Sequence, residues 1–346
     1  MGFAVPPIED PNQPDFPTDQ DDDFGDDAEA GAGDGAPMTL VLSEADCGMR
    51  LDKVLTSRLP QYSRSRIQQW IEEGHVTVDG KTARAKTTMF GDETVLVQPQ
   101  AAADAHAYEP EAMALDIVHE DDAIIVINKP AGLVVHPGAG NWSGTLQNGL
   151  LHYHKPIADV PRAGIVHRLD KDTSGLMVVA KTMQAQTDLV RQLQARTVHR
   201  VYLALVWGTP QVGGKVDAAI GRHPRERIRM SVQNNLSAKP AVTRFQRLAT
   251  GVLDGKPVSL VQCELETGRT HQIRVHMQHL GFALVGDALY GKPHLASVFH
   301  RQALHACRLG LIHPESREEC EWTAPLPADF AALLEKAGIA SANLDA

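Results

Sequence analysis

In the first third of the chain, apolar residues recur with helical spacing. In the run MRLDKVLTSRL, the apolar positions from Leu51 to Leu59 fall on one face of a helix. A second apolar stripe, from Ile67 to Ile71, ends before Gly74, and glycine readily adopts the left-handed conformation that closes many helices. The pattern predicts two short helices in succession.

After these helices the pattern changes to the alternation typical of strands. HVTVDGK alternates apolar and polar residues, and its Asp79-Gly80 pair favours a tight hairpin turn. TVLVQP supplies a further short strand. Two helices that lead into a hairpin predict a small domain of its own over residues 38–98.

Beyond residue 114 the chain has many short apolar runs separated by turns. Four of these runs have the character of strands: AIIVINKP, GLMVVAKT, RVYLALVWG and VSLVQCELET. DLVRQLQA and a segment that begins near Thr270 have helical spacing instead. Because strands and helices do not alternate regularly, we predict an α+β fold with a mixed, mainly antiparallel central sheet and flanking helices. Neither GxGxxG nor GxxxxGKS/T follows a strand, so no nucleotide cofactor is expected.

Composition indicates the segments that surround these two domains. Residues 1–37 hold eleven acidic residues and no Lys or Arg, and they have too few aliphatic residues to form a core. We expect a disordered, solvating leader there, and the alternative is a segment that mimics a phosphate backbone. Residues 99–113 have the composition of a linker. We expect the larger domain to cover residues 114–335 and a C-terminal tail to cover residues 336–346.

The net charge of -10 is concentrated in the leader. Removing its eleven acidic residues from the total of 43 leaves 32, against 33 Lys and Arg in the whole chain. From Arg50 to Lys86 there are eight basic and four acidic residues, and the later run GRHPRERIRM has four arginines and one glutamate. These local excesses favour RNA binding over a plain solvated surface. The candidate RNA-binding residues are Arg50, Lys53, Arg64, Arg66, Arg222, Arg225, Arg227 and Arg229.

The cysteines and the apolar runs indicate the compartment. The four cysteines lack CxxC spacing, so we expect reduced thiols rather than zinc ligands or disulfides. No apolar run approaches the ~20 residues of a membrane-spanning helix. The first residues lack the basic and apolar regions of a secretory signal. We therefore expect a cytoplasmic protein with no membrane partner.

The run HRLDKDTSG, residues 167–175, has two interpretations. Its acidic and small polar residues match the first half of an EF-hand calcium loop. The twelfth position of that loop requires a glutamate, but Lys181 stands there, and the flanking segments have the pattern of strands rather than helices. We therefore expect no metal at this run.

Asp170 is the candidate nucleophile in the same run. If GIVHRLD is extended, Arg168 and Asp170 lie on one face, and a neighbouring guanidinium keeps a carboxylate ionised. An ionised carboxylate can act as a nucleophile at neutral pH. On spacing alone, a structural ion pair between the two residues is the favoured interpretation.

Two later segments hold further candidates. In RVYLALVWG, Tyr202 lies opposite the main apolar row of the strand, where it is either core or part of a pocket. The predicted helix near Thr270 carries Ile273 and Arg274.

The same predicted helix holds three histidines. They lack the acidic partner or the HExxH pattern of a metal site. We expect solvated or RNA-facing side chains at His271, His276 and His279.

Taken in their order along the chain, these runs resemble the RluA-type pseudouridine synthases. The resemblance rests on NKPAGLVVHPG, HRLDKDTSG, RVYLALV and TGRTHQIRVHM. The helix pair and hairpin, with Arg64 and Arg66 at the start of the second helix, resemble the S4 RNA-binding domain. Longer runs such as LETGRTHQIRVHMQHLGFALVGDALYG narrow the resemblance to the members that modify large-subunit ribosomal RNA.

The resemblance implies a role for each candidate. Asp170 matches the family's catalytic aspartate, and Arg274 matches the basic residue that pairs with it. Tyr202 matches the tyrosine that stacks on the target base, in a pocket that Ile273 lines. Arg168 matches an arginine associated with the space that the flipped nucleotide leaves. The acidic leader has no counterpart in the resemblance.

The resemblance also implies the pseudouridine synthase fold and an enzyme without a cofactor, because the isomerisation of uridine involves no redox change. Its implied substrate is the hairpin loop of helix 69 in 23S rRNA, where unpaired uridines can be splayed out. We expect a monomer. A synthase for other uridines of 23S rRNA or transfer RNA would show the same motifs. A non-catalytic RNA-binding protein would not need Asp170 beside Arg168.

Overall fold

The computed structural model describes residues 37–60, 62, 64–100, 108–138, 141–226 and 228–340. Apart from Pro37, the predicted acidic leader lies outside these residues. So do Arg227, part of the predicted linker, and the last six residues of the predicted tail.

The first part of the fold is the small module predicted for residues 38–98. After a 3-10 turn (Glu44–Asp46), its helices are α1 (Leu51–Arg58) and α2 (Arg64–Glu72). Its antiparallel sheet has the order β1 (Met38–Val41), β4 (Thr94–Val97), β2 (Val76–Val78) and β3 (Lys81–Thr82). Strand β1 was not predicted, because it is short and its partner β4 lies at the other end of the module.

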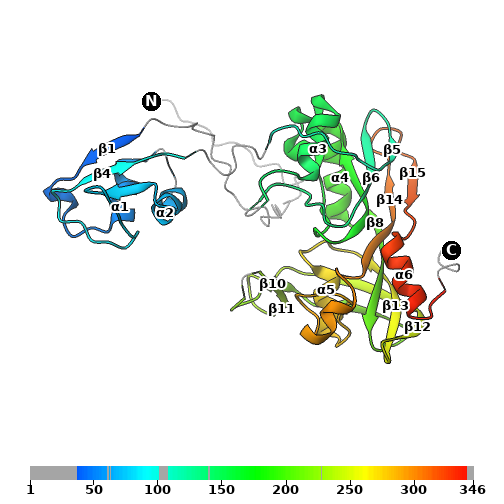
Figure 1. Cartoon of the computed structure of the whole chain (residues 1–346). Helices are drawn as coiled ribbons and strands as arrows, with labels where there is room; N and C mark the ends of the chain where they lie inside the picture. The colour runs from blue at the N-terminus through cyan, green and yellow to red at the C-terminus, as the bar shows by residue number, and fades with distance from the viewer. Residues whose placement is uncertain are drawn as a thin grey trace, which may run out of the picture.

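The predicted apolar faces form the core of this module. Leu51 of α1 and Ile67 of α2 are fully buried in one cluster that the strands complete. Asp79 and Gly80 have φ values of 49° and 76°, which suit the tight turn between β2 and β3. Figure 1 shows this module in blue and cyan.

The larger module is built on a nine-stranded sheet. Its order is β5 (Ile117–Glu120), β6 (Ile124–Lys129), β7 (Ser174–Ala180), β14 (Leu304–Ile312), β8 (His199–Trp207), β13 (Lys256–Leu265), β12 (Val242–Leu253) and β9 (Gly213–Asp217), with β15 (Glu319–Thr323) beside β14. A separate hairpin pairs β10 (Ile220–Arg222) with β11 (Met230–Val232). Among the strands that the structure describes, β7 and β14 pair in parallel and the other neighbours are antiparallel. The predicted mixed, mainly antiparallel sheet is confirmed.

Helices cover both faces of this sheet (Figure 1). They are α3 (Leu146–Tyr153), α4 (Met183–Ala195), α5 (Gln272–His279) and α6 (Ala328–Lys336), with 3-10 turns at Lys155–Asp159, Pro161–Gly164 and Pro293–Val298. On β8, Tyr202 packs with α3 and α5 on one face, whereas Leu203 packs with α6 on the other. The alternation of β8 therefore places Tyr202 on the side of α5. No helix in the described ranges has the length and apolarity that a bilayer span requires.

The structure moves two predicted boundaries. The backbone N–H of Glu111 donates to the Asn148 carbonyl at 3.0 Å, and the Asn148 amide donates to the Glu109 carbonyl at 2.8 Å. These bonds attach residues 109–111, which were predicted to be linker, to the larger module. At the other end, Ala337 and Ile339 are buried beside α6, so the predicted tail begins too early.

Gly175, in the HRLDKDTSG run, allows two strands to approach closely. Its φ is 116°, and a Cβ at this position would lie 2.2 Å from the carbonyl oxygen of Ala306. The parallel pairing of Ser174 with His305 brings the two backbones together here. A side chain at position 175 would force β7 and β14 apart, which explains the glycine without a calcium loop.

A buried lysine joins the end of β6 to the loop that carries Asp170. Lys129 is 0% exposed. Its Nζ donates to the carbonyl oxygens of Pro130, Leu133 and Lys171 at 2.9, 2.8 and 2.9 Å. Burial lowers the pKa of Lys129 to about 7, although the nearby carboxylates oppose this shift. Three carbonyls meet at one amine, and this fixes the loop that precedes β7.

His167 and His305 are both buried in the larger module, where their rings are neutral. His167 Nε2 accepts a hydrogen bond from the backbone N–H of Val178 at 3.1 Å, and His305 Nδ1 lies 3.0 Å from the Ser174 hydroxyl. Burial lowers the pKa of His167 to about 3 and that of His305 to about 4. Both rings therefore stay neutral in the folded protein at a pH where an unfolded histidine is charged.

The stability of the fold should fall as the pH decreases below the pKa of an unfolded histidine. At pH 5 the unfolded chain binds a proton at position 167 and the folded chain does not. His167 should therefore lower the free energy of unfolding by about 2 kcal/mol between pH 7 and pH 5. Carboxylates with lowered pKa values, such as Asp52 and Asp121, lose their contribution only at more acidic pH.

Urea unfolding of the wild type and of His167→Gln at both pH values checks this expectation. The variant should be less stable at pH 7 but should lose about 2 kcal/mol less on acidification. His294→Gln is the control, because His294 is exposed and should leave the pH dependence unchanged. Equal pH dependence in the wild type and His167→Gln would contradict the assignment of a neutral buried ring.

Candidate active site

Asp170 lies in the loop between the 3-10 turn at Pro161–Gly164 and strand β7. Residues 166–173 form neither helix nor strand, so the premise that GIVHRLD is an extended strand is wrong. The exposed Arg168 places its guanidinium 3.2 Å from His136 Nε2. It forms no ion pair with Asp170, although the structure describes both side chains. The spacing of the run therefore indicated the wrong guanidinium for Asp170, whereas the family resemblance implied Arg274.

The guanidinium beside Asp170 belongs to Arg274 of α5. Its Nη1 donates to Asp170 Oδ2 at 3.0 Å. The Asp170 side chain keeps 17% of its surface exposed and that of Arg274 keeps 8%, so the pair lies at the edge of the core. Thr173 N donates to the Asp170 carbonyl at 3.0 Å and helps to fix the loop. This geometry brings together two candidates that are 104 residues apart in the chain.

A second carboxylate, Asp287, holds the other side of Arg274. Its side chain is fully buried, and it accepts from Arg274 Nε at 2.7 Å and from Nη2 at 3.0 Å. The backbone N–H groups of Leu289 and Tyr290 donate to the same carboxylate at 3.0 and 2.9 Å. Burial alone would lower the pKa of Arg274, but Asp287 and Asp170 raise it well above its ordinary value. The guanidinium is therefore a fixed cation in one orientation.

Apolar side chains adjoin this pair. Tyr202 is 5% exposed and Ile273 is 3% exposed, and both belong to the core cluster on the α5 side of the sheet. Burial raises the pKa of Tyr202 to about 12, and the charge of Asp170 acts in the same direction. The phenol is therefore protonated at neutral pH and offers a ring and a hydrogen-bond donor.

The three histidines near this helix differ in their surroundings. His276 is fully buried, with Nδ1 2.8 Å from the Thr243 hydroxyl and Nε2 2.9 Å from the Ala218 carbonyl, so the prediction of a solvated ring was wrong there. It lies three residues after Ile273, on the buried face of the helix. His279 is exposed as predicted, and His271 is half-buried with Nε2 3.9 Å from Asp170 Oδ1. Within the described ranges, no group of three or more metal-binding side chains comes together.

In the small module, a buried carboxylate organises two of the predicted RNA-binding arginines. Asp52 accepts from Arg50 at 2.9 Å, from Arg64 at 2.7 Å and from Gln68 at 2.8 Å. Burial alone would raise the pKa of Asp52, but the hydrogen bonds from these partners lower it to about 2. Each arginine keeps a third or more of its side chain exposed. The two cations are therefore fixed in place on one surface.

The two remaining RNA-binding candidates in this module, Arg66 and Lys53, differ in their contacts. The Arg66 guanidinium lies over the rings of Tyr62 and Trp70, at 5.4 and 5.3 Å, and donates to the Gln100 carbonyl at 3.1 Å. Lys53 is exposed and lines a hollow of about 240 Å³ together with Arg64. Arg66 therefore has a packing role, whereas Lys53 is available to a ligand.

The arginines of GRHPRERIRM lie on the hairpin of β10 and β11 and its loop. Arg222 and Arg225 are exposed. Arg229 is half-buried, bonds Glu226 at 3.2 Å, and lies over the ring of Tyr290 at 5.4 Å. The two ends of this run belong to strands β10 and β11.

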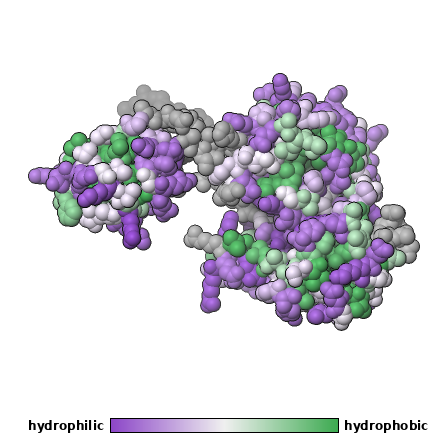
Figure 2. All heavy atoms as spheres, viewed as in Figure 1, coloured by the Kyte–Doolittle hydropathy of each residue, from purple (hydrophilic) through white to green (hydrophobic). Residues whose placement is uncertain are grey.

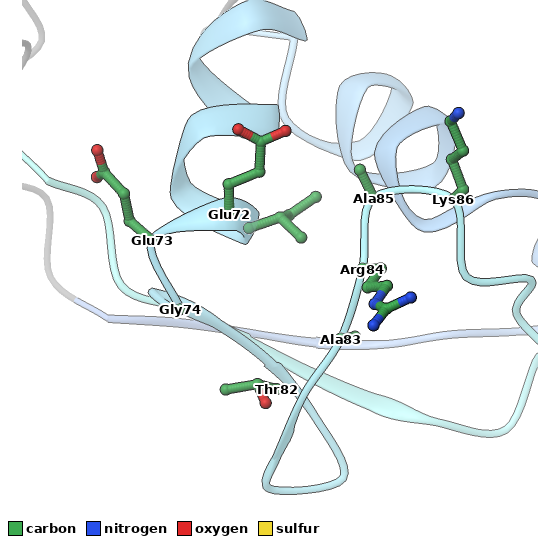
Figure 3. A pocket seen from close by; sticks show the side chains of 9 residues that line it. Glu72, Glu73, Gly74, Thr82, Ala83, Arg84, Ala85 and Lys86 are labelled. Carbon is green, nitrogen blue, oxygen red and sulfur yellow. The ribbon is translucent and has the colours of Figure 1, made fainter.

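A groove of about 630 Å³ opens elsewhere on the small module, between the end of α2 and the loop after β3. Figure 3 shows Glu72 and Glu73 along one wall and Arg84 and Lys86 along the other. Its two carboxylates balance its two cations, so this groove has no excess of positive charge to attract phosphate. Figure 2 shows hydrophilic residues over much of the visible face of this module.

The sequence matches two known protein families. Residues 123–279 match the family described as RNA pseudouridylate synthase. Residues 49–88 match the S4 domain, within the small module. The first match contains Asp170, Tyr202 and Arg274 and ends before Asp287.

Curated relatives resemble the chain over most of its length. A protein of Neisseria meningitidis serogroup B, named ribosomal large subunit pseudouridine synthase D, is 48% identical over 333 residues, which cover 93% of this chain and 86% of the relative. Proteins of the same name from Nitrosomonas europaea and Escherichia coli K12 are each 50% identical. These matches cover 86% of this chain in both cases, and 87% and 93% of the relatives.

Solved structures resemble the larger part of the chain. Human RNA pseudouridylate synthase domain containing 1 aligns with a TM-score of 0.52 and 32% identity, covering 63% of this chain and 86% of that structure. Human RNA pseudouridylate synthase domain containing 4 aligns with a TM-score of 0.50 and 26% identity, covering 64% and 92%.

Sequence reasoning missed three residues of this site. Lys129, Asp287 and Tyr290 lie at the end of a strand or in a turn, where no periodic pattern marks a buried polar group. Asp287 and Tyr290 belong to the run GDALYG, which contributed to the resemblance without receiving a role.

The buried ion pair should contribute strongly to stability. Asp287→Asn should lower the free energy of unfolding by about 3–5 kcal/mol, because it leaves a buried guanidinium with one carboxylate instead of two. Urea unfolding measures the change. Asp254→Asn is the matched control, because the bond of Asp254 to Lys336 lies at the surface and should contribute less than about 1 kcal/mol. A loss at position 287 no larger than at position 254 would contradict this account.

Proposed function

We propose a target and a catalytic mechanism for this chain, which belongs to the RNA pseudouridylate synthase family and is an RNA pseudouridine synthase. The proposed target is uridine in the 23S rRNA of the large ribosomal subunit, and the proposed catalytic residue is Asp170. The observation that carries the proposal is the bond between Asp170 and an Arg274 that a second carboxylate holds in place.

The reaction requires an ionised carboxylate in a pocket that excludes bulk water. Uridine loses its C1'–N1 bond, the uracil rotates, and C5 bonds to C1', while the C5 proton is released and N1 gains one. In our proposal Asp170 attacks C6 of the ring or C1' of the sugar, or removes a sugar proton to give a glycal. All three routes need the negative charge that Arg274 stabilises. No oxidant, reductant or cofactor enters the balance.

The uracil must leave its stack before Asp170 can reach it. We assign Tyr202 to contact with the flipped base and Ile273 to the apolar lining beside it, because both adjoin the Asp170 pair. Stacking on an aromatic ring is worth roughly 1–3 kcal/mol per base, which offsets part of the free-energy cost of unstacking the uracil from the RNA. Arg168 is exposed, and we assign it to contact with the space that the flipped nucleotide leaves in the RNA.

The curated relatives are named for the large ribosomal subunit, and this supports a ribosomal target. Within 23S rRNA we propose the hairpin loop of helix 69, because unpaired loop uridines can be splayed out at lower energy than paired ones. The enzyme would act in the cytoplasm as a monomer, on the rRNA or the assembling subunit. A related synthase with another 23S or transfer RNA target would share the same site.

We propose that the S4 module docks the RNA. Arg50 and Arg64, fixed by Asp52, and the exposed Lys53 would contact phosphates. On the larger module, Arg222 and Arg225 would contact the same RNA, while Arg227 lies outside the described residues. A non-catalytic RNA-binding protein would need these surfaces but not the buried pair at Asp170.

Asp170→Asn should abolish pseudouridine formation while the protein still folds and binds RNA. The amide keeps the shape of the side chain but removes its charge, so activity should fall to about 1% of the wild type or less. Tritium release from 5-tritiated rRNA measures turnover. Asp172→Asn is the matched control, because Asp172 lies in the same loop and uses its backbone carbonyl, not its carboxylate, to bond Arg301. Substantial activity in Asp170→Asn would remove Asp170 from its proposed role.

A deletion strain tests the target. Carbodiimide modification and primer extension should show loss of pseudouridine from the helix 69 loop, restored by the wild-type gene and not by Asp170→Asn. Pseudouridines that persist in this loop but disappear elsewhere would replace the proposed target and leave the enzyme assignment intact.

A further inference from the structure

Tyr290 lies where the β10–β11 hairpin meets the buried ion pair. Tyr290 is 3% exposed. Its hydroxyl oxygen accepts a hydrogen bond from the backbone N–H of Met230, the first residue of β11, at 2.8 Å. The same oxygen lies 2.8 Å from Nδ1 of His271. One hydroxyl therefore contacts both the hairpin and the residue that precedes α5.

The ring of Tyr290 contacts one arginine from each side of this junction. The Arg274 guanidinium carbon lies 5.0 Å from the ring centroid, and that of Arg229 lies 5.4 Å from it. Both distances are within the range of a cation–π interaction, which is stronger when the cation is desolvated. Arg274 is the partner of Asp170, and Arg229 belongs to the hairpin loop.

The base of the hairpin also packs on this tyrosine. Ile220 of β10, Val275 of α5 and Tyr290 form one buried cluster, with Met230 and Val232 against it. The backbone N–H of Tyr290 is itself bonded to Asp287, the carboxylate that orients Arg274. A displacement of the hairpin therefore acts on Tyr290 from one side, and Tyr290 contacts Arg274 on the other.

His271 gives a second connection to Asp170. Burial lowers the pKa of His271, although the charge of Asp170 opposes this, so the ring is neutral. When the Tyr290 hydroxyl donates to Nδ1, the remaining proton of His271 is on Nε2, which lies 3.9 Å from Asp170 Oδ1. Loss of the hydroxyl would free both the ring orientation and the tautomer of His271.

We propose that Tyr290 is a positioning residue whose hydroxyl couples the seating of the β10–β11 hairpin on RNA to the orientation of His271 at Asp170. The inference rests on the proposed RNA substrate and adds a route from RNA docking to catalysis. A hairpin seated on RNA fixes Met230 and Arg229, these fix Tyr290, and the Tyr290 hydroxyl holds the histidine that faces the carboxylate. The catalytic step then becomes faster when the correct RNA is docked.

A double-mutant cycle tests the coupling. Arg225→Glu changes an exposed arginine of the hairpin loop without touching Tyr290. Tyr290→Phe removes the hydroxyl and keeps the ring between the arginines. In the wild-type background, Arg225→Glu should raise KM and also lower kcat about fivefold. In the Tyr290→Phe background, Arg225→Glu should raise KM by the same factor but change kcat less than about twofold. Tyr290→Phe alone should lower kcat about fivefold or more.

Tyr62→Phe is the matched control, because Tyr62 is a buried tyrosine of the small module beside Trp70. Tyr62→Phe should leave kcat unchanged, both in the wild-type background and in the Tyr290→Phe background. Arg229→Gln gives an independent variant that removes the hairpin's cation from the ring without altering Tyr290, and it should reproduce the lower kcat. Melting temperatures of all variants show that the compared proteins are folded.

Two results would overturn the proposal. One is an equal effect of Arg225→Glu on kcat in both backgrounds, which would make Tyr290 a purely structural residue. The other is a wild-type kcat in Tyr290→Phe or in Arg225→Glu. Tritium release from whole 5-tritiated large-subunit rRNA counts turnover at any uridine, so an error in the helix 69 target would appear in the mapping and not in this cycle. A wild-type enzyme active only on transfer RNA would overturn the ribosomal target, and the same cycle on that RNA would decide the coupling.

Discussion

The candidate active site depends on one buried guanidinium that two carboxylates hold in place. Arg274 uses Nε and Nη2 for Asp287 and leaves Nη1 for Asp170. Because Asp287 is fully buried and also receives two backbone N–H groups, it fixes the plane of the guanidinium. Asp170 is the exposed end of this arrangement, so it is the carboxylate that a substrate can reach.

The sheet supplies the rigidity that this arrangement requires. Lys129 ties the Asp170 loop to the end of β6, and Gly175 lets β14 approach β7 directly after that loop. Helix α5 packs through Ile273 on the face of β8 that carries Tyr202. The loop, the helix and the ring are thus held by separate elements that meet over one face of the sheet.

The elements were more predictable from the sequence than the contacts between them. Strand β8 and helix α1 followed from apolar periodicity, because tertiary packing buries the same face that the pattern marks. The pairing of Arg168 with Asp170 was wrong because residues 166–173 do not belong to a strand, and spacing fixes a shared face only in regular structure. Asp287 was not found because its partner Arg274 lies on another element, and a buried polar contact in a turn leaves no local pattern. His276 could have been placed correctly from its position on the buried face of its helix.

The order of strands in the sheet sets the order in which the enzyme can be completed. Strand β14 lies between β7 and β8, although β7 and β8 precede it by more than a third of the larger module's length. During synthesis, the two earlier strands leave the ribosome without the strand that separates them. The centre of the sheet, and with it the support of the Asp170 loop, can close only when nearly the whole chain has been made. Nascent chains should therefore be unable to modify RNA at the ribosome that is making them.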